Sequence, residues 1–331
     1  MKTRRELVEK TIRSKDAHVI PHHILFFPVL EKLFRERLGA DDLDAAIGNA
    51  VRWVGADIPM VSAGDGLQED SFGVVWKTDL RNRGCVVRSP LKEPDMRLVR
   101  IPQYNYAGIF ARLPAELQRT CEYYNILWIG DLFERAQMLR GMEECLTDFY
   151  LNPGFLHELF DALADLIVRN ICAAMPLDVP AVFLSDDYGT QKGLLISRAL
   201  WREFIRPRLR RIVDAAHNCG KTFFLHSDGD MGELIPDLIE LGVDAIHPVQ
   251  PETMDFRRLK REYGKDICFY GGIGTQQTLR FGRPEDVRRE IAGLKSCPDG
   301  TGFILAPTLQ LMEDVPVENV MALIEEVREA L

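Results

Sequence analysis

Between residues 181 and 308, short apolar runs alternate with amphipathic segments, and this alternation constrains the fold more than any other feature of the sequence. Each run is apolar enough to be buried on both faces, as the strands of a parallel sheet are. Amphipathic segments with helical spacing lie between the runs, which indicates repeated strand–helix units and a parallel α/β fold. The runs predicted as strands are residues 181–187, 222–228, 245–250, 267–272 and 302–308.

The first half of the chain is less regular. Two further runs, 56–62 and 123–131, are predicted as strands, and residues 132–175 are predicted to be mostly helical. Residues 72–89 predict a β-hairpin whose polar turn is the stretch DLRNRG, residues 79–84. Seven barrel strands are then visible where a (β/α)8 TIM barrel needs eight, so we expect the missing strand to be short or distorted.

We therefore predict one domain over residues 1–331, a (β/α)8 TIM barrel. Residues 1–55 are expected to form an N-terminal helical segment packed on the barrel, and the 72–89 hairpin is expected to be an insertion. The alternative is an open doubly wound sheet, but no G-x-G-x-x-G motif follows the first predicted strand. A chain of 331 residues, 46% of them hydrophobic, is long enough to bury such a core.

Composition excludes several classes of function. The formal net charge of -9 disfavours nucleic acid or an anionic membrane as a partner. The seven cysteines form no CxxC pair, which favours reduced thiols. The first residues lack the apolar core of a signal peptide, and no stretch approaches the roughly 20 apolar residues of a membrane span. We expect a cytoplasmic protein that acts on a small molecule.

Candidate site residues follow the predicted strands. In a barrel, active-site groups lie at the carboxyl ends of the strands. His226 and Asp228 share one face of their strand, because side chains alternate with period two, and both should line the barrel mouth. Together they can bind one cation or act as a proton-transfer pair. The other candidates at strand ends are Asp186, Asp187, Tyr188, His247, Gln250, Gly272, Gln276 and Thr308.

Each candidate also has a purely structural interpretation. His247 is most simply a hydrogen-bonded residue of the framework. Asp186 and Asp187 point opposite ways if their strand persists, so we expect one of them to face the mouth; alternatively, the pair caps the following turn. The glycine-rich stretch 271–278 can cradle a phosphate, but we favour an ordinary strand-to-helix turn. The arginines between 198 and 211 read as the solvated face of an outer helix.

Residues 186–252, from DDYGTQKG to HPVQPE, resemble the uroporphyrinogen decarboxylase superfamily. The resemblance continues through FYGGIGTQQTLRFGRPEDVRREI, residues 269–291, and GFILAPTLQLMEDVPVENVMALIEE, residues 302–326. Upstream, residues 20–39 and 58–64 fit more loosely. The resemblance implies a (β/α)8 barrel, in agreement with the strand pattern.

The superfamily has two chemical branches. One decarboxylates uroporphyrinogen without a cofactor, and the other contains methyltransferases that act with corrinoid proteins and use zinc. The decarboxylase branch carries an N-terminal R-Q-A-G-R motif and a histidine after the last strand; here the comparable positions hold His22, His23 and Leu309. The methyltransferase branch carries H-x-C and a further Cys or His. His226 matches that pattern, whereas Asp228 and Leu309 depart from it.

The resemblance therefore implies a methyltransferase more than a decarboxylase. We expect methyl transfer between a methylated small molecule or cofactor and a partner corrinoid protein that carries methylcobalamin. His226, Asp228 and Asp187 are expected to be catalytic, and the other strand-end candidates to bind substrate. Uroporphyrinogen decarboxylation and a non-catalytic ligand-binding barrel remain the alternatives.

Zinc is a possible cofactor by the same resemblance. Its expected ligands, His226 and Asp228, are an incomplete set. Asp187, His247 or a substrate group would have to complete the shell. Without a metal, the pair would work as acid and base.

Overall fold

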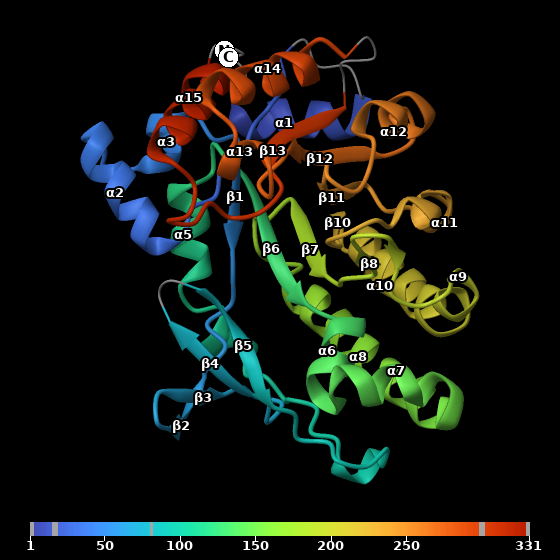
Figure 1. Ribbon diagram of the computed structural model, residues 1–331. Coiled ribbons are helices and arrows are strands. Elements are labelled where there is room, and N and C mark those ends of the chain that lie inside the picture. Colours follow the sequence, from blue (N-terminus) through green and yellow to red (C-terminus); the bar gives the residue numbers. More distant parts are fainter. Residues whose placement is uncertain (1–2, 15–18, 80–81, 298–301, 329–331) are drawn as a thin grey trace.

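The computed structural model describes residues 3–14, 19–79, 82–297 and 302–328. Its centre is a parallel sheet of seven strands (Figure 1). The strands lie in the sheet in the same order as in the sequence, and each is hydrogen-bonded to the next. In spatial order the strands are β1 (Val51–Val54), β6 (Tyr124–Gly130), β7 (Ala181–Ser185), β10 (Thr222–His226), β11 (Ala245–Val249), β12 (Cys268–Ile273) and β13 (Phe303–Pro307).

A short segment, residues 21–26, lies between the two edges of this sheet. Leu305 of β13 donates its N–H to the carbonyl of Pro21 (2.9 Å) and accepts from His23 N–H (3.0 Å). On the other side, Ala50 N–H, just before β1, donates to the carbonyl of His22 (2.9 Å). The segment makes isolated parallel bridges rather than a regular strand. This irregular segment lies where a short or distorted eighth strand was expected.

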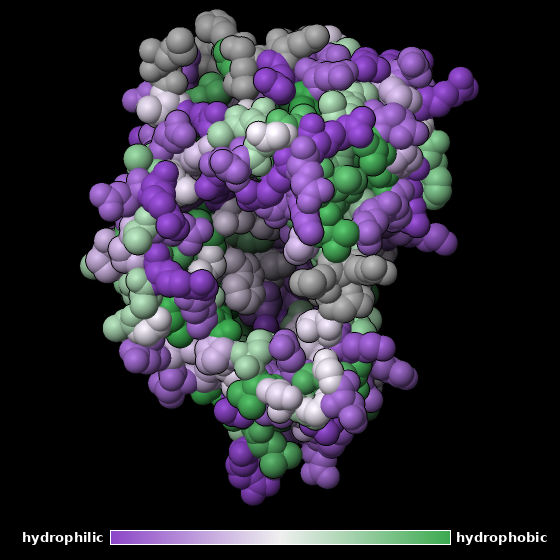
Figure 2. Space-filling model, turned by 90° about the vertical axis from the view of Figure 1, so that its left-hand side faces the viewer, coloured by the Kyte–Doolittle hydropathy of each residue, from purple (hydrophilic) through white to green (hydrophobic). Residues whose placement is uncertain are grey.

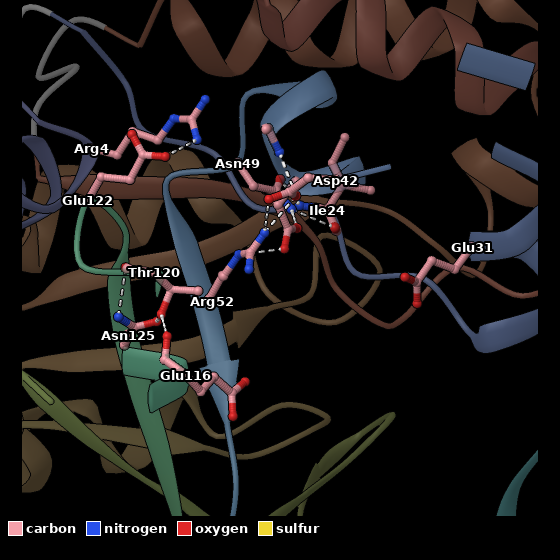
Figure 3. Close-up of polar contacts among 12 residues, drawn as sticks. Arg4, Ile24, Glu31, Asp42, Asn49, Arg52, Glu116, Thr120, Glu122 and Asn125 are labelled. Carbon is pink, nitrogen blue, oxygen red and sulfur yellow. Dashed lines mark hydrogen bonds and ion pairs between the residues drawn. The ribbon is translucent and has the colours of Figure 1, made fainter. Parts of the chain in front are cut away.

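Asn49 ties this segment in place (Figure 3). Its buried amide accepts from the Ile24 N–H (2.8 Å) and donates to the Ile24 carbonyl (3.0 Å), as a neighbouring strand would. The same amide nitrogen also donates to Asp44 Oδ1 (2.6 Å). Because buried backbone groups need partners, Asn49 supplies the pairing that the irregular segment cannot obtain from a full strand.

The sheet encloses an apolar interior. Side chains of alternate residues on each strand point inward, from Tyr124 and Ile126 on β6 to Ile304 and Ala306 on β13. Val8 and Ile12 of helix α1 (Arg4–Ser14) join the same cluster and cover the amino-terminal end of the strands. The opposite residues of each strand pack in a second, larger layer against the outer helices. A site is therefore expected at the opposite, carboxyl ends of the strands.

The outer layer consists of helices that connect the strands. The expected helical region 132–175 contains α6, α7 and α8. The outer helix expected to carry the arginines between 198 and 211 is interrupted by a π-turn, Trp201–Ile205. The main outer helices are α6 (Phe133–Arg140), α7 (Met142–Leu151), α8 (Pro153–Ala173), α10 (Arg206–Asn218), α11 (Ile235–Leu241), α12 (Phe256–Tyr263), α14 (Pro284–Lys295) and α15 (Val317–Arg328). Shorter helices are α2 (Pro28–Leu38), α3 (Leu43–Ile47), α4 (Tyr106–Ile109), α5 (Leu113–Arg119), α9 (Arg198–Leu200) and α13 (Thr278–Phe281).

A four-stranded antiparallel sheet lies beyond the carboxyl ends of β1 and β6, in the lower part of Figure 1. Its strands are β2 (Val61–Gly64), β3 (Leu67–Glu69), β4 (Val75–Asp79) and β5 (Asn82–Arg88). The predicted hairpin is confirmed as β4 and β5, although residues 80–81 of its turn lie outside the described residues. A buried ion bridge joins this sheet to the barrel: Arg135 of α6 contacts Asp70 (2.7 Å) and Asp131 (2.8 Å).

Two predictions for the first half need correction. The strand expected at 56–62 is wrong, because β1 is Val51–Val54 and Val61 already belongs to the antiparallel sheet. Pro59 has no N–H to donate to a ladder, and Met60 and Val61 are exposed, so this run has no buried face. Residues 1–55 do more than pack on the barrel, since they supply β1 and the segment that closes the sheet. Within the described ranges, no helix combines the length and apolarity that crossing a membrane requires.

Replacing Asn49 with Ala should destabilise the protein by about 2–4 kcal/mol, because two buried backbone groups of Ile24 lose their partner. Urea unfolding followed by circular dichroism measures the change. The exposed Asn218→Ala on α10 is the control and should stay within about 0.5 kcal/mol of the wild type. Equal stability of the two variants would contradict the closing role of Asn49.

Candidate functional site

His226 and Asp228 emerge together at the carboxyl end of β10, as the sequence indicated. His226 Nε2 lies 3.5 Å from Asp187 Oδ1 and 4.0 Å from Asp228 Oδ1. One ligand atom from each of these three partly buried residues falls within 4.8 Å of the others. We call this group the Asp187–His226–Asp228 triad.

The loops after β7 and β10 hold the two carboxylates. Asp228 N–H donates to Asp187 Oδ1 (2.7 Å). Gln250, which follows β11, accepts from Gly229 N–H (2.6 Å) and donates through Nε2 to Asp228 Oδ1 (3.3 Å). The loops approach so closely that a Cβ on Gly229 would lie 2.5 Å from the backbone carbonyl carbon of Gly189. The close approach therefore requires glycine at both positions.

His247 contacts the triad from the neighbouring strand. Its Nδ1 lies 2.8 Å from His226 Nδ1, so one of these nitrogens carries the shared proton. Because His226 directs its Nε2 to the carboxylates, its Nδ1 is the atom that His247 orients. Deeper in the interior, Tyr270 packs on His247 and hydrogen-bonds to His23. Burial lowers the pKa of His23 to about 3, which keeps this ring neutral.

The triad fits a divalent cation. It offers one imidazole nitrogen and two carboxylate oxygens that converge on one small space, and zinc accepts all of these atoms as ligands. Two oxygens and one nitrogen form a harder donor set than thiolates, and such sets also suit manganese or magnesium. Asp187 thus lies beside the two ligands expected from the sequence, and His247 contacts the ring nitrogen of His226 that faces away from the carboxylates.

Glu134 is a site residue that the sequence analysis missed. It lies in the first turn of α6 and accepts from Ser185 Oγ (3.2 Å) beside the triad. Burial and the neighbouring charges of Asp187, Asp131 and Asp186 raise its pKa to about 9, which favours the protonated carboxyl at neutral pH. The sequence pattern that could have identified Glu134 is its position after a strand. Asp131 and Glu134 follow β6 just as the other polar candidates follow the later strands.

A cleft opens between the barrel mouth and the antiparallel sheet, and Figure 2 shows the surface hollowed in this region. Asp131 and Arg135 lie at its barrel side, and Asp70 and Trp76 at its sheet side. Met138 lines both this cleft and a second pocket that contains Glu134. Met138 thus places this cleft next to the pocket that contains Glu134.

Comparison with known proteins now identifies the family. The family model described as uroporphyrinogen decarboxylase (URO-D) matches residues 133–330, more than half of the chain and all of the triad. The chain belongs to the uroporphyrinogen decarboxylase family.

Curated members of this family are distant relatives. Uroporphyrinogen decarboxylase from Aliivibrio salmonicida is 27% identical over 188 residues, which cover 54% of this chain and 50% of the relative. The Pseudomonas putida enzyme is 26% identical over 184 residues, with the same coverage. The chain thus spans about half the length of the curated relatives it matches. A solved methyltransferase from Methanosarcina mazei covers 99% of both chains at a TM-score of 0.74 and 14% identity, which shows a shared fold.

Two predicted substrate-binding residues of this family member face away from the mouth. Asp186 is buried and accepts from the N–H groups of Leu132 (3.1 Å) and Glu134 (2.9 Å) at the start of α6. Burial raises its pKa to about 7. Tyr188 is buried against Phe133 and Trp201 in the layer between sheet and helices. As expected, one residue of the Asp186–Asp187 pair faces the mouth, and it is Asp187.

Three other candidates also lie off the triad. A Cβ on Gly272 would contact Leu294 and Phe256 of the outer layer, so this residue does not face the interior. Gln276 donates its N–H to Glu252 (3.0 Å), and Gly274 N–H donates to Glu290 (2.7 Å). Glu252 and Glu290 thus occupy the backbone N–H groups that a phosphate would need, which supports an ordinary strand-to-helix turn instead of a phosphate site. Thr308 is buried and shares a hydrogen bond with Thr275 (2.7 Å).

Replacing Glu134 with Gln should stabilise the protein at alkaline pH. The folded-state pKa of Glu134 is raised from 4.5 to about 9, so the unfolded chain loses this proton first, and native stability falls as pH rises through that interval. The neutral amide removes this loss. We expect a gain of at least about 1 kcal/mol at pH 8 that shrinks toward pH 5.

Thermal unfolding at several pH values, with EDTA present to remove bound cations, measures this difference. The exposed Glu93→Gln serves as the matched control and should show no pH-dependent gain. If the stability of Glu134→Gln relative to wild type is lower at pH 8 than at pH 5, the Glu134 carboxylate is ionised in the folded protein.

Proposed function

We propose that this protein transfers a methyl group between a methylated small molecule and a partner corrinoid protein, with the Asp187–His226–Asp228 triad at the reacting centre. The convergence of these three side chains at the carboxyl ends of β7 and β10 is the observation that carries the proposal. The family and the shared fold with a methyltransferase support it.

The charge of the mouth argues against a polyanionic substrate such as uroporphyrinogen. Asp131, Asp187 and Asp228 gather there, and the nearby Arg135 is already bound between two carboxylates. His22 and His23, which stand where the decarboxylase branch has its arginine-rich motif, are buried in the framework. A tetrapyrrole with many carboxylates would meet repulsion rather than the clustered arginines it requires.

A divalent cation held by the triad would act as a Lewis acid that stabilises negative charge on the heteroatom losing or gaining the methyl group. The chain's own residues have separate tasks. His247 fixes the ring of His226, and Gln250 fixes the carboxylate of Asp228. The protonated Glu134 can supply a proton to a leaving oxygen, and Ser185 holds that carboxyl in place.

Metal content tests the triad directly. Protein purified with added zinc or manganese should retain about one ion per chain by elemental analysis, and His226→Ala should lose it. The partly exposed His217→Ala on α10, where the histidine bonds to Asp244, is the control and should keep the ion. Equal metal content in His226→Ala and His217→Ala would place the ion elsewhere.

Asp228→Cys should change the preference of the site for metals. A thiolate in place of a carboxylate softens the donor set, so the affinity for zinc relative to manganese should rise by about tenfold or more. Competitive titration with a chromophoric chelator measures both affinities. Glu252→Cys, at a carboxylate that bonds Gln276 away from the triad, should leave the ratio unchanged. An unchanged ratio in Asp228→Cys would remove Asp228 from the ligand set.

Methyl transfer itself is tested by anaerobic mixing with cob(I)alamin and methyl ethers or methylamines. Formation of methylcobalamin is followed by its absorbance spectrum. Asp187→Asn should lower kcat/KM by about a hundredfold or more, because the triad loses a charged group at the reacting centre. Absence of any spectral change with all donors, or formation of coproporphyrin from uroporphyrinogen, would overturn the proposal.

A further inference from the structure

Helices α8 and α10 pack side by side in the outer layer and run in the same direction. Two ion pairs set their register. Arg208 of α10 bonds to Asp161 of α8 (2.6 Å), and about one turn later Arg211 bonds to Asp165. Residue numbers therefore rise together on the two helices, as expected when each helix connects neighbouring strands of one parallel sheet.

The same register brings two cysteines together at the carboxyl ends of these helices. Eleven residues beyond the Asp161–Arg208 pair, or about three helical turns, lie Cys172 (161 to 172) and Cys219 (208 to 219). The thiol of Cys219 hydrogen-bonds to that of Cys172. Because Cys172 is exposed and Cys219 is half-buried, a small oxidant in the solvent can reach the pair.

A lysine lies beside the two thiols. Lys221 is buried and donates from Nζ to the carbonyl of Leu177 (2.8 Å), which follows α8 in the chain. Burial and the contact with Cys172 raise the pKa of the Cys219 thiol, whereas the ammonium of Lys221 acts to lower it. A fixed ammonium favours the thiolate, which is the form of cysteine that attacks another sulfur atom.

We propose that Cys172 and Cys219 form a reversible disulfide when the protein meets hydrogen peroxide. The exposed thiolate of Cys172 attacks one peroxide oxygen, the O–O bond breaks, and the departing hydroxide leaves as water after it gains a proton. The sulfur of Cys219 then attacks the resulting sulfenic acid, the S–O bond breaks, and the departing hydroxide takes the proton of the Cys219 thiol. In total, two thiols lose two electrons and two protons, and the peroxide becomes two waters.

The bond would fasten the barrel at the end opposite the triad. Cys172 lies before β7 and Cys219 before β10, and the far ends of these strands lead to Asp187 and His226. Joining residues 172 and 219 closes a long loop in the unfolded chain, which lowers the entropy of that state. The melting temperature of the oxidised protein should therefore exceed that of the reduced protein by about 3 °C or more.

Counting thiols by mass spectrometry tests this inference. The full chain is treated with hydrogen peroxide, quenched with catalase, unfolded and alkylated with iodoacetamide. Wild type should lose two of its seven alkylated cysteines, and non-reducing peptide mapping should find Cys172 linked to Cys219. Cys219→Ser should form no disulfide. The control is Cys121→Ser, which removes a different exposed thiol and should still lose two.

Four outcomes would overturn the disulfide. They are no loss of thiols at a peroxide concentration that oxidises glutathione, equal loss in wild type and Cys219→Ser, a covalent dimer on a non-reducing gel, and irreversible oxidation of Cys172 in place of the bond. A link that dithiothreitol opens, with a matching fall in melting temperature, supports the inference. This result does not depend on whether the protein transfers methyl groups.

Discussion

The register of three parallel strands determines what meets at the mouth of this barrel. Ser185, His226 and His247 lie side by side on β7, β10 and β11, because these residues are direct partners in the ladders. One step below, Phe183, Phe224 and Ala245 fill the interior on the same face. One step above, Asp187 and Asp228 extend from the strand ends. A slip of one residue would turn each of these side chains into the helix layer.

Several carboxyl groups lie close together at the mouth of the barrel and would repel one another if all were ionised and unpaired. Each is stabilised in a different way. Asp131 is balanced by Arg135, and Asp186 accepts two backbone N–H groups at the start of α6. Glu134 retains its proton, since burial and its neighbours disfavour a further negative charge. Asp187 and Asp228 share the imidazole of His226. Of these solutions, the last leaves two carboxylates facing one space, which is the arrangement that a cation satisfies best.

Local patterns in the sequence were sufficient for most of the sheet, because each parallel strand is a compact apolar run. The ends of β6, β7, β10, β11, β12 and β13 fall within three residues of the predicted runs. The alternation of side chains along β7 also predicts which neighbours of Asp187 face outward. Asp186 and Tyr188 continue the face of Val182 and Leu184, which packs against the outer helices. The same alternation predicts wrongly that Gly272 faces the interior, because Gly271 has a φ of 134° and interrupts the regular strand.

What the sequence could not reveal depends on contacts between distant segments. Glu134 reaches the site only because β6 and β7 are neighbours, which brings α6 beside Ser185. The closing segment is too irregular to carry a strand pattern, and its backbone at Ile24 is paired by the side-chain amide of Asn49. The four-stranded sheet was visible as one hairpin, because β2 and β3 are short and largely exposed and so lack an apolar face.

The ion bridge from Asp70 to Arg135 and Asp131 crosses a boundary within the chain. Arg135 falls inside the stretch that matches the family, residues 133–330, whereas Asp70 and most residues that line the cleft between the barrel mouth and the antiparallel sheet precede it. Under the proposed function, the reactive groups and the residues that line this cleft are thus encoded in successive parts of one polypeptide. Under that proposal, mutations before residue 133 would reshape the cleft while the triad stays intact, so a lineage with this architecture would change its ligand without rebuilding the reacting centre.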